Sequence, residues 1–365
     1  MNSECYRSWR RCSVKDLLKN QLLWAGVVLL VLVGIVLAKN QTGIFGYVNG
    51  RITSPLIDIL QDAPPIMMIA LGMTLVIATS GIDLSVGSVM AVGGATAMQF
   101  LANSANGDSA AAAATAFVLA IVVGTACGAF SGFLVSVVRL QPFITTLIMM
   151  ILGRGLANVV TGGKNTPGNS PTFNWITQGR LFGIPVGFII AVIILLAVAA
   201  LVRRTALGMN IEAVGINPVA AEMTGIRSSR ILFMVYTISG LLAAIGGCFA
   251  VAQVGTVEVN SSGTGAALEM DAILAVVIGG TSLAGGKFHL GGSFLGALIV
   301  VTLTPAMVYL GVPAPAVPAV KAVVIIFICL LQSERLRGWF VRRKKPTGNG
   351  SQAQDKATTS KAVAA

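Results

Sequence analysis

Long apolar stretches with few charges recur along this chain, and they constrain its fold more than any other feature. A helix that crosses the hydrocarbon core of a bilayer needs roughly 20 apolar residues. The stretches that approach this length are 22–38, 56–78, 86–103, 110–138, 143–161, 181–202, 231–252, 271–284, 290–311 and 316–332. Backbone groups in lipid are satisfied only in helices and closed barrels, and stretches this long favour helices. The sequence therefore predicts an all-α polytopic membrane protein with about ten transmembrane helices.

Two of these stretches are expected to be broken. Pro64 and Pro65 interrupt 56–78, whereas 271–284 is too short to cross alone and ends in a Gly-rich segment. Irregular backbone at membrane depth is tolerated where protein or a water-filled cavity satisfies the freed polar groups. The breaks therefore indicate either a transport pathway or kinks that only serve helix packing.

The composition excludes several other classes of protein. Charged residues make up 10% of the chain, hydrophobic residues 55%, and the mean hydropathy is +0.85. Soluble domains carry about 25% charged residues, so an ordinary soluble enzyme or a disordered chain is excluded. The net charge of +12 lies in clusters at predicted membrane edges, so we expect no nucleic-acid partner. The five cysteines are scattered without a CxxC pair, and we expect no metal site.

The distribution of Lys and Arg predicts the orientation in the membrane. Most of the 25 basic residues fall in three segments, 1–20, 203–230 and 336–365, and basic segments tend to stay in the cytoplasm. Both termini are therefore expected to be cytoplasmic, with six spans before 203–230 and four after it. We divide the chain into a basic arm (1–20), a transmembrane domain (21–335) and a basic, disordered tail (336–365). Val36-Leu37-Ala38 resembles a signal-peptide cleavage site, but the apolar run is longer than usual, so we expect an uncleaved first span.

The segment 203–230 is the longest predicted cytoplasmic loop between spans. Asn217-Pro218 is typical of a helix start and Gly225 of a helix end, so the segment predicts a short helix across the cytoplasmic face. A soluble partner could push against such a helix. The alternative is a polar connector without a mechanical role.

Polar residues within or beside the spans are candidates for a gate or a pathway. Asp83, in the string TSGIDLSVG, either gates the path or simply caps the following helix. The full set of gate or pathway candidates is Thr79, Asp83, Ser85, Asn158, Gln253 and Asp271. Each of these side chains could instead serve hydrogen bonds between helices.

Two cations fall inside predicted spans, and small residues recur in two others. We expect Arg154 to pair with Asp271 or Asp62, and Lys321 to extend toward the outer face. The small residues, which predict close helix packing, are Gly124, Gly128 and Gly132 in one span and Gly292 and Gly296 in another.

Four strings together resemble the permeases of bacterial monosaccharide ABC transporters of the ribose/galactose/xylose type. They are AVGINPVAAEMTGI (213–226), GMTLVIATSGIDLSVGSVMAVGG (72–94), DAILAVVIGGTSLAGGKFHLGGSFLGAL (271–298) and the shorter QPFITTL (141–147). Within that group the sequence is most similar to the galactofuranose and fructose types. The resemblance covers roughly residues 50–335, which would make 21–335 the permease domain.

The resemblance implies a function and a set of partners. Such permeases lie in the bacterial cell membrane and import monosaccharides, either pentoses or hexoses. They pair as homodimers or heterodimers, bind an ATP-hydrolysing ABC subunit and receive the sugar from an extracytoplasmic sugar-binding protein. In this sequence, loops 162–180 and 253–270 are candidates to contact the delivering protein. The residues that match or flank the family's coupling motif are Glu212, Gly215, Asn217, Ala220, Ala221, Gly225, Ile226 and Arg227.

The residues independently indicate that this chain does no chemistry. No string fits the phosphate-binding pattern GxxxxGK[ST], so ATP would have to be bound by another polypeptide. The single histidine, His289, lies in a predicted turn, which disfavours an intramembrane enzyme. No cofactor is expected. An ion-coupled secondary transporter that works without an ATPase remains the alternative.

Overall fold

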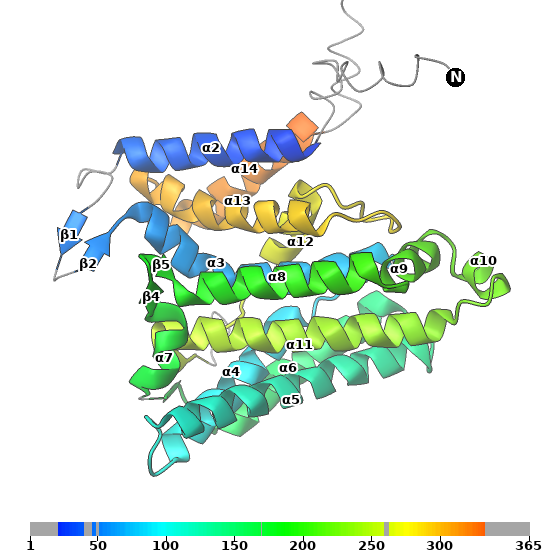
Figure 1. Ribbon diagram of the computed structural model, residues 1–365, viewed down its shortest axis with the longest axis horizontal. Coiled ribbons are helices and arrows are strands. Elements are labelled where there is room, and N and C mark those ends of the chain that lie inside the picture. The colour runs from blue at the N-terminus through cyan, green and yellow to red at the C-terminus, as the bar shows by residue number, and fades with distance from the viewer. Residues whose placement is uncertain (1–20, 40–45, 49–50, 169, 259–262, 333–365) are drawn as a thin grey trace, which may run out of the picture.

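The computed structural model describes residues 21–39, 46–48, 51–168, 170–258 and 263–332, and they form a helical bundle (Figure 1). The basic arm 1–20 and the tail 336–365 lie outside the described residues. The helices are α2 Gln21–Lys39, α3 Pro55–Ala78, α4 Val86–Asn103, α5 Ala110–Ser136, α6 Pro142–Thr161, α7 Pro171–Gln178, α8 Val186–Arg204, α9 Leu207–Ile216, α10 Pro218–Met223, α11 Ser228–Val254, α12 Leu268–Ile278, α13 Leu290–Tyr309 and α14 Val317–Gln332, with the 3-10 turn η2 Ala314–Ala316.

The strands are short and form only two-stranded antiparallel pairs within the described ranges. They are β1 Gly46–Val48 with β2 Arg51–Thr53, β3 Thr166–Pro167 with β6 Thr256–Val257, and β4 Arg180–Leu181 with β5 Ile184–Pro185. The β3–β6 pair joins Thr166 to Val257. It therefore brings together loops 162–180 and 253–270, which the sequence proposes as contacts for a delivering protein.

The helices confirm a polytopic membrane protein. Six of them, α3, α5, α6, α8, α11 and α13, are long and apolar enough to cross a membrane. Every predicted apolar stretch contains a helix, but they are not all equivalent. Helix α12 has 11 residues and so extends about 16 Å, roughly half of the hydrocarbon thickness. It is a half-helix inside the bundle.

The expected break at Pro64 and Pro65 is wrong. Helix α3 runs through both prolines without ending, and both side chains are buried. Neighbouring helices can satisfy the backbone groups that proline frees inside a membrane protein, so the helix need not end there. The break in the path of the chain lies instead after α3, where residues 79–85 precede α4.

Small residues bring the central helices into close contact. Helix α11 packs against α3, α4 and α5, and α13 packs against α2, α3 and α12. A Cβ atom on Gly128 of α5 would lie 2.8 Å from the Cα of Gly240 on α11, and a Cβ on Gly296 would overlap the backbone of Ala275 on α12. The predicted close packing of the small residues is thus confirmed, because any larger side chain would separate these helices.

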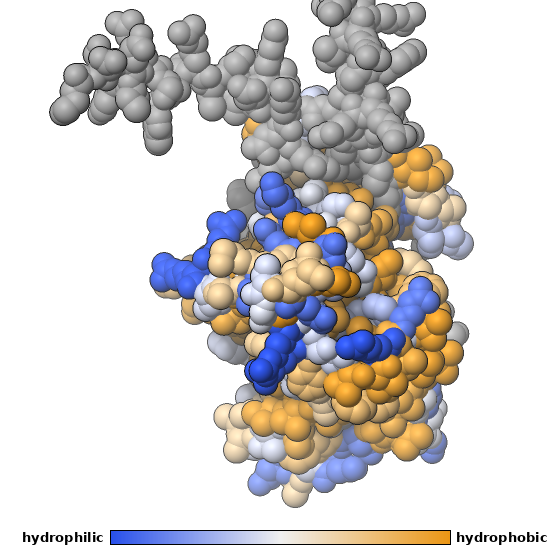
Figure 2. All heavy atoms as spheres, turned by 90° about the vertical axis from the view of Figure 1, so that its right-hand side faces the viewer, coloured by the Kyte–Doolittle hydropathy of each residue, from blue (hydrophilic) through white to orange (hydrophobic). Residues whose placement is uncertain are grey.

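The two ends of the bundle differ in what they carry. Helices α9 and α10 extend from one end, which we call the α10 end, and α2 begins and α14 ends there as well (Figure 1). The β1–β2 and β4–β5 hairpins and α7 lie at the opposite, α7 end. Figure 2 looks onto the α10 end and shows hydrophilic side chains among apolar ones, with hydrophobic side chains along the flank.

Candidate coupling face and translocation path

Helix α10 is built by local signals that the sequence contains. The side-chain oxygen of Asn217 accepts hydrogen bonds from the backbone N–H groups of Val219 (3.0 Å) and Ala220 (3.1 Å), and Pro218 fills the first helical position. The helix ends where Gly225 adopts a φ of +89°. The predicted short helix is therefore present, with both predicted boundaries.

The side of α10 that faces away from the bundle carries two large apolar side chains beside the exposed Glu222. Val219 is 62% exposed and Met223 85% exposed, one turn apart, whereas Ala221 points inward and is buried. The backbone N–H of Ile226 donates to the Ala221 carbonyl (3.1 Å), which folds the chain back toward α11. A surface with these two side chains at the α10 end is suited to docking another protein.

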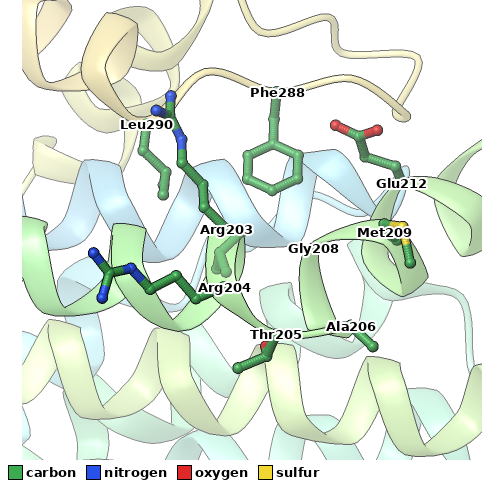
Figure 3. Close-up of a pocket in the computed structure, with 10 residues that line it drawn as sticks. Arg203, Arg204, Thr205, Ala206, Gly208, Met209, Glu212, Phe288 and Leu290 are labelled. Carbon is green, nitrogen blue, oxygen red and sulfur yellow. The ribbon is translucent and has the colours of Figure 1, made fainter.

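The charged residues that flank the coupling motif stay unpaired. Among the described residues, neither Glu212 nor Arg227 takes part in an ion pair. Glu212 lines a pocket of about 490 Å³ between α8, α9 and the turn before α13. In Figure 3, Arg203 extends toward Leu290, whereas Phe288 lies between Arg203 and Glu212, which is on the opposite side of the pocket. The pocket therefore separates α9 from Phe288 and Leu290.

Gly215, near the end of α9, meets two turns that are distant in sequence. The hydroxyl of Ser80 donates to the Gly215 carbonyl (2.7 Å) and lies 3.0 Å from the Ala284 carbonyl. The backbone N–H of Gly286 donates to the Ala78 carbonyl at 2.9 Å. A Cβ atom on Gly215 would overlap the Ala78 carbonyl oxygen. We call the contact among residues 78–80, 215 and 284–286 the turn junction.

The turn junction connects α9 to the ends of α3 and α12, which are built alike. The N–H of Gly81 donates to the Val76 carbonyl (3.1 Å), and the N–H of Thr281 donates to the Val276 carbonyl (3.2 Å). Each helix is followed by a residue in the left-handed region, Ser80 (φ 61°) after α3 and a glycine after α12. The turn junction therefore places the end of α9 in contact with both helix ends.

The buried side chain of Asp83 links the start of α4 to α11 through hydrogen bonds. Its side chain is enclosed, with the residue only 3% exposed. One carboxylate oxygen accepts from the backbone N–H (3.0 Å) and the hydroxyl of Ser85, and the other accepts from the hydroxyl of Ser239 (2.8 Å). The carboxylate thus fixes the start of α4 while also contacting a second helix.

Two other pathway candidates satisfy their hydrogen bonds within their own helices. The Thr79 hydroxyl donates to the Val76 carbonyl (2.8 Å) and the side chain is buried. The Asn158 amide nitrogen donates to the Arg154 carbonyl (2.9 Å), but Asn158 itself is exposed. Of these two, only Asn158 presents a polar group to a surface.

Gln253 and Asp271 connect different helices instead. The Gln253 amide of α11 donates to Asp62 of α3, and Gln178 donates to the Gln253 carbonyl (3.1 Å). Asp271, in the first turn of α12, accepts from the Lys321 ammonium of α14 at 2.6 Å. Both residues therefore hold helices together, and Gln253 does so near the α7 end.

The expected partner of Arg154 is wrong, and Lys321 has a partner that the sequence did not predict. Arg154 of α6 pairs with Glu269 (3.3 Å), not with Asp271 or Asp62, because the first turn of α12 places Glu269 beside α6. Lys321 does not extend to the outer face, because Asp271 lies within hydrogen-bond distance. Glu269 falls within the predicted outer loop 253–270, but it is the second residue of α12. Glu269 and Asp271, the two acidic residues at the start of α12, are the sequence feature from which both ion pairs could have been predicted.

We expect the cap of α10 to depend on the side chain of Asn217. Changing Asn217→Ala removes two hydrogen bonds to the first turn, which costs roughly 1 kcal/mol of helix stability. Hydrogen–deuterium exchange of residues 219–224 should become about fivefold faster, since such exchange reports local opening. Asn217→Asp keeps the acceptor and should exchange like the wild type. Equal protection in the alanine variant would refute the cap.

The Lys321–Asp271 pair should show the behaviour of a partly buried ion pair. The two side chains are 15% and 17% exposed. Lys321→Met leaves the carboxylate unpaired and should destabilise the protein by about 2 kcal/mol, less than for a fully buried pair. The double variant Lys321→Met with Asp271→Leu should recover most of the loss, as measured by thermal unfolding in detergent. A double variant as unstable as the single one would contradict this.

The bundle, with its capped helix at the α10 end and its paired loops at the α7 end, defines the class of protein as an integral membrane protein with several spanning helices. The chain belongs to the family described as the branched-chain amino acid transport system / permease component, which it matches over residues 56–330. No solved structure matches the chain.

Three relatives illustrate the similarity to sugar permeases. The chain is 49% identical to the fructose import permease protein FruF of Bifidobacterium longum (strain NCC 2705), over 93% of this chain and 96% of the relative. It is 44% identical to the galactofuranose transporter permease protein YtfT of Escherichia coli (strain K12), over 79% and 82%. It is 41% identical to the ribose import permease protein RbsC of the same strain, over 85% and 92%. The expected resemblance to monosaccharide permeases is thereby confirmed.

Proposed function

We propose that this chain is the permease subunit of an ATP-driven importer of a monosaccharide and that it provides the path through the bacterial cell membrane. The observation that carries the proposal is the coupling face: a capped helix with two exposed apolar side chains, Val219 and Met223, joined through Gly215 to the turn junction. A secondary transporter that works alone has no use for such a face. The relatives that import fructose, galactofuranose and ribose support a sugar substrate.

In this proposal the membrane is crossed by all the long apolar helices, with α12 completed by its flanks. The α10 end faces the cytoplasm. This assignment is supported by Arg203 and Arg204 at the end of α8 and by the positions of the start of α2 and the end of α14 at the same end (Figure 1). Both termini are then cytoplasmic, as the basic segments 1–20 and 336–365 favour.

The partners follow from the two ends of the bundle. An ATP-hydrolysing ABC subunit docks on α10, and its movement reaches α3 and α12 through the turn junction. A sugar-binding protein outside the cell docks at the α7 end, where β3 and β6 hold the two candidate loops together. A second permease, identical or homologous, completes the path. We infer that specificity for the sugar lies mostly in the binding protein, because a transient site in the membrane suffices for release.

The proposal is tested by uptake in cells that lack their own sugar importers. The chain is produced together with an ABC ATPase and a sugar-binding protein from the same organism, and labelled ribose, fructose, galactose and galactofuranose are offered separately. We expect one of these sugars to accumulate, and accumulation to stop when the ATPase carries a substitution in its own phosphate-binding lysine. Accumulation of none of them, or accumulation that survives loss of the ATPase, would contradict the proposal.

A further inference from the structure

A charged side chain lies partly exposed within a membrane-crossing helix. Arg154 lies about 10 Å along the axis of α6 from its end at Thr161, which places it inside the hydrocarbon region. Its side chain is 29% exposed. Apart from Asn158, the fully exposed side chains of α6 are apolar, among them Ile144, Ile151 and Val159. Arg154 and Asn158 are therefore exceptions on a helix that otherwise fits a lipid surface.

Glu269 prevents Arg154 from escaping to the membrane surface. The guanidinium donates to one Glu269 oxygen at 3.3 Å, and the Glu269 side chain is only 8% exposed. The other Glu269 oxygen is buried without a hydrogen-bond partner among the described residues and faces Gly87 at the start of α4. The ion pair therefore fixes the guanidinium at this depth, beside the first turn of α12. Most of its five N–H donors remain available.

Charged side chains inside a membrane face the bundle interior or a water-filled cavity, because contact with lipid is costly. The exposed part of Arg154 thus indicates that the edge of α6 beside α12 is in contact with water. Two neighbours on this edge have suitable chemistry. Asn158 lies one turn further along α6 and is exposed, and Met270, next to Glu269 on α12, is 56% exposed. We call these three residues the α6–α12 edge.

We propose that the α6–α12 edge lines the translocation path and that Arg154 and Asn158 contact the sugar hydroxyls as the sugar passes. The inference rests on the proposed function. Guanidinium donors and an amide carbonyl match the acceptors and donors of a polyol, and the Met270 thioether suits the C–H face of a sugar ring. Glu269 is a positioning residue that holds Arg154 in the path. Because α12 also ends at the turn junction, the same half-helix links the coupling face to this edge.

Water exposure of the edge is tested by cysteine labelling, which does not depend on transport activity. Asn158→Cys and Met270→Cys are made in a variant without native cysteines, and the assembled transporter in vesicles is treated with a charged methanethiosulfonate reagent. The control is Ile193→Cys on α8, which is 59% exposed and lies about 10 Å from the start of its helix. We expect labelling at positions 158 and 270 to be about tenfold faster than at 193, because the thiolate forms only in water. Labelling as slow as the control at both positions would overturn the proposal.

Contact with the sugar is tested by transport kinetics. Arg154→Lys keeps a cation that can pair with Glu269 but loses the planar set of guanidinium N–H donors. This variant should lower uptake about fivefold while leaving the labelling of Met270→Cys unchanged. Val159→Leu, on the apolar face of α6, is the control and should transport normally. Normal uptake by Arg154→Lys would exclude the sugar contact. If the wild type imports sugar while the edge stays unlabelled, this inference fails alone, whereas a wild type that imports no sugar contradicts the proposed function itself.

Discussion

Replacing Met223 by aspartate is expected to separate the permease from its ATPase while the permease stays folded. Met223 is 85% exposed, more than Val219 on the same helix, and lies outside the hydrophobic core. An apolar anchor at the centre of an interface is worth about 2 kcal/mol or more, and a buried carboxylate without a partner adds to the loss. Co-purification of the ATPase should fall at least about tenfold.

The matched control for Met223→Asp is Phe182→Asp. Phe182 lies at the α7 end and is 98% exposed, so the substitution adds the same charge to a similarly exposed apolar position. Phe182→Asp should leave the ATPase bound, and Met223→Leu should bind normally. The coupling face would be wrong if Met223→Asp retained the ATPase, or if both aspartate variants lost it equally.

Gly215→Val should uncouple ATP hydrolysis from sugar uptake. Even a Cβ atom at this position overlaps the Ala78 carbonyl oxygen, so the valine must push α9 away from the turn junction. Overpacking of this kind costs about 1–3 kcal/mol, which displaces a contact without unfolding a large bundle. Because α10 remains exposed, the ATPase should still bind and hydrolyse ATP, but uptake should fall by about tenfold or more.

The control for this variant is Gly155→Val on α6. A Cβ atom on Gly155 meets no atom within 4 Å, so a side chain added at this position of another helix begins in open space. Uptake by Gly155→Val should resemble that of the wild type. Normal uptake by Gly215→Val would show that force does not pass through the turn junction, whereas loss of ATPase binding would show that the valine disrupts α10 itself.

Helix positions were predictable because lipid imposes a simple rule on sequence. A run of apolar residues has few alternatives to a helix, so each expected stretch contains one. Prolines misled the prediction for α3, because a helix enclosed by other helices tolerates them. The small residues of α5 predicted close packing correctly, but not that Gly128 would face Gly240 of α11. Which helices touch depends on the whole fold.

The candidate site was predictable where its signals are local. The cap of α10 depends on Asn217, Pro218 and Gly225, which lie within one segment, and all three have the expected roles. Pairs between distant segments were not predictable from spacing. Ser80 reaches Gly215, and Arg154 reaches Glu269, only because α9 and α12 are folded against other helices. A charged residue within a span predicts that a residue of opposite charge lies nearby, but not which residue that is.

The most direct test of the central claim is transport by purified components. The permease, its ATPase and its sugar-binding protein are reconstituted in vesicles without an ion gradient, and accumulation of labelled sugar is measured with and without ATP on the side of the α10 end. We expect accumulation against the concentration gradient only when all the components and ATP are present. Accumulation by the permease alone, driven by a proton or sodium gradient, would contradict the account.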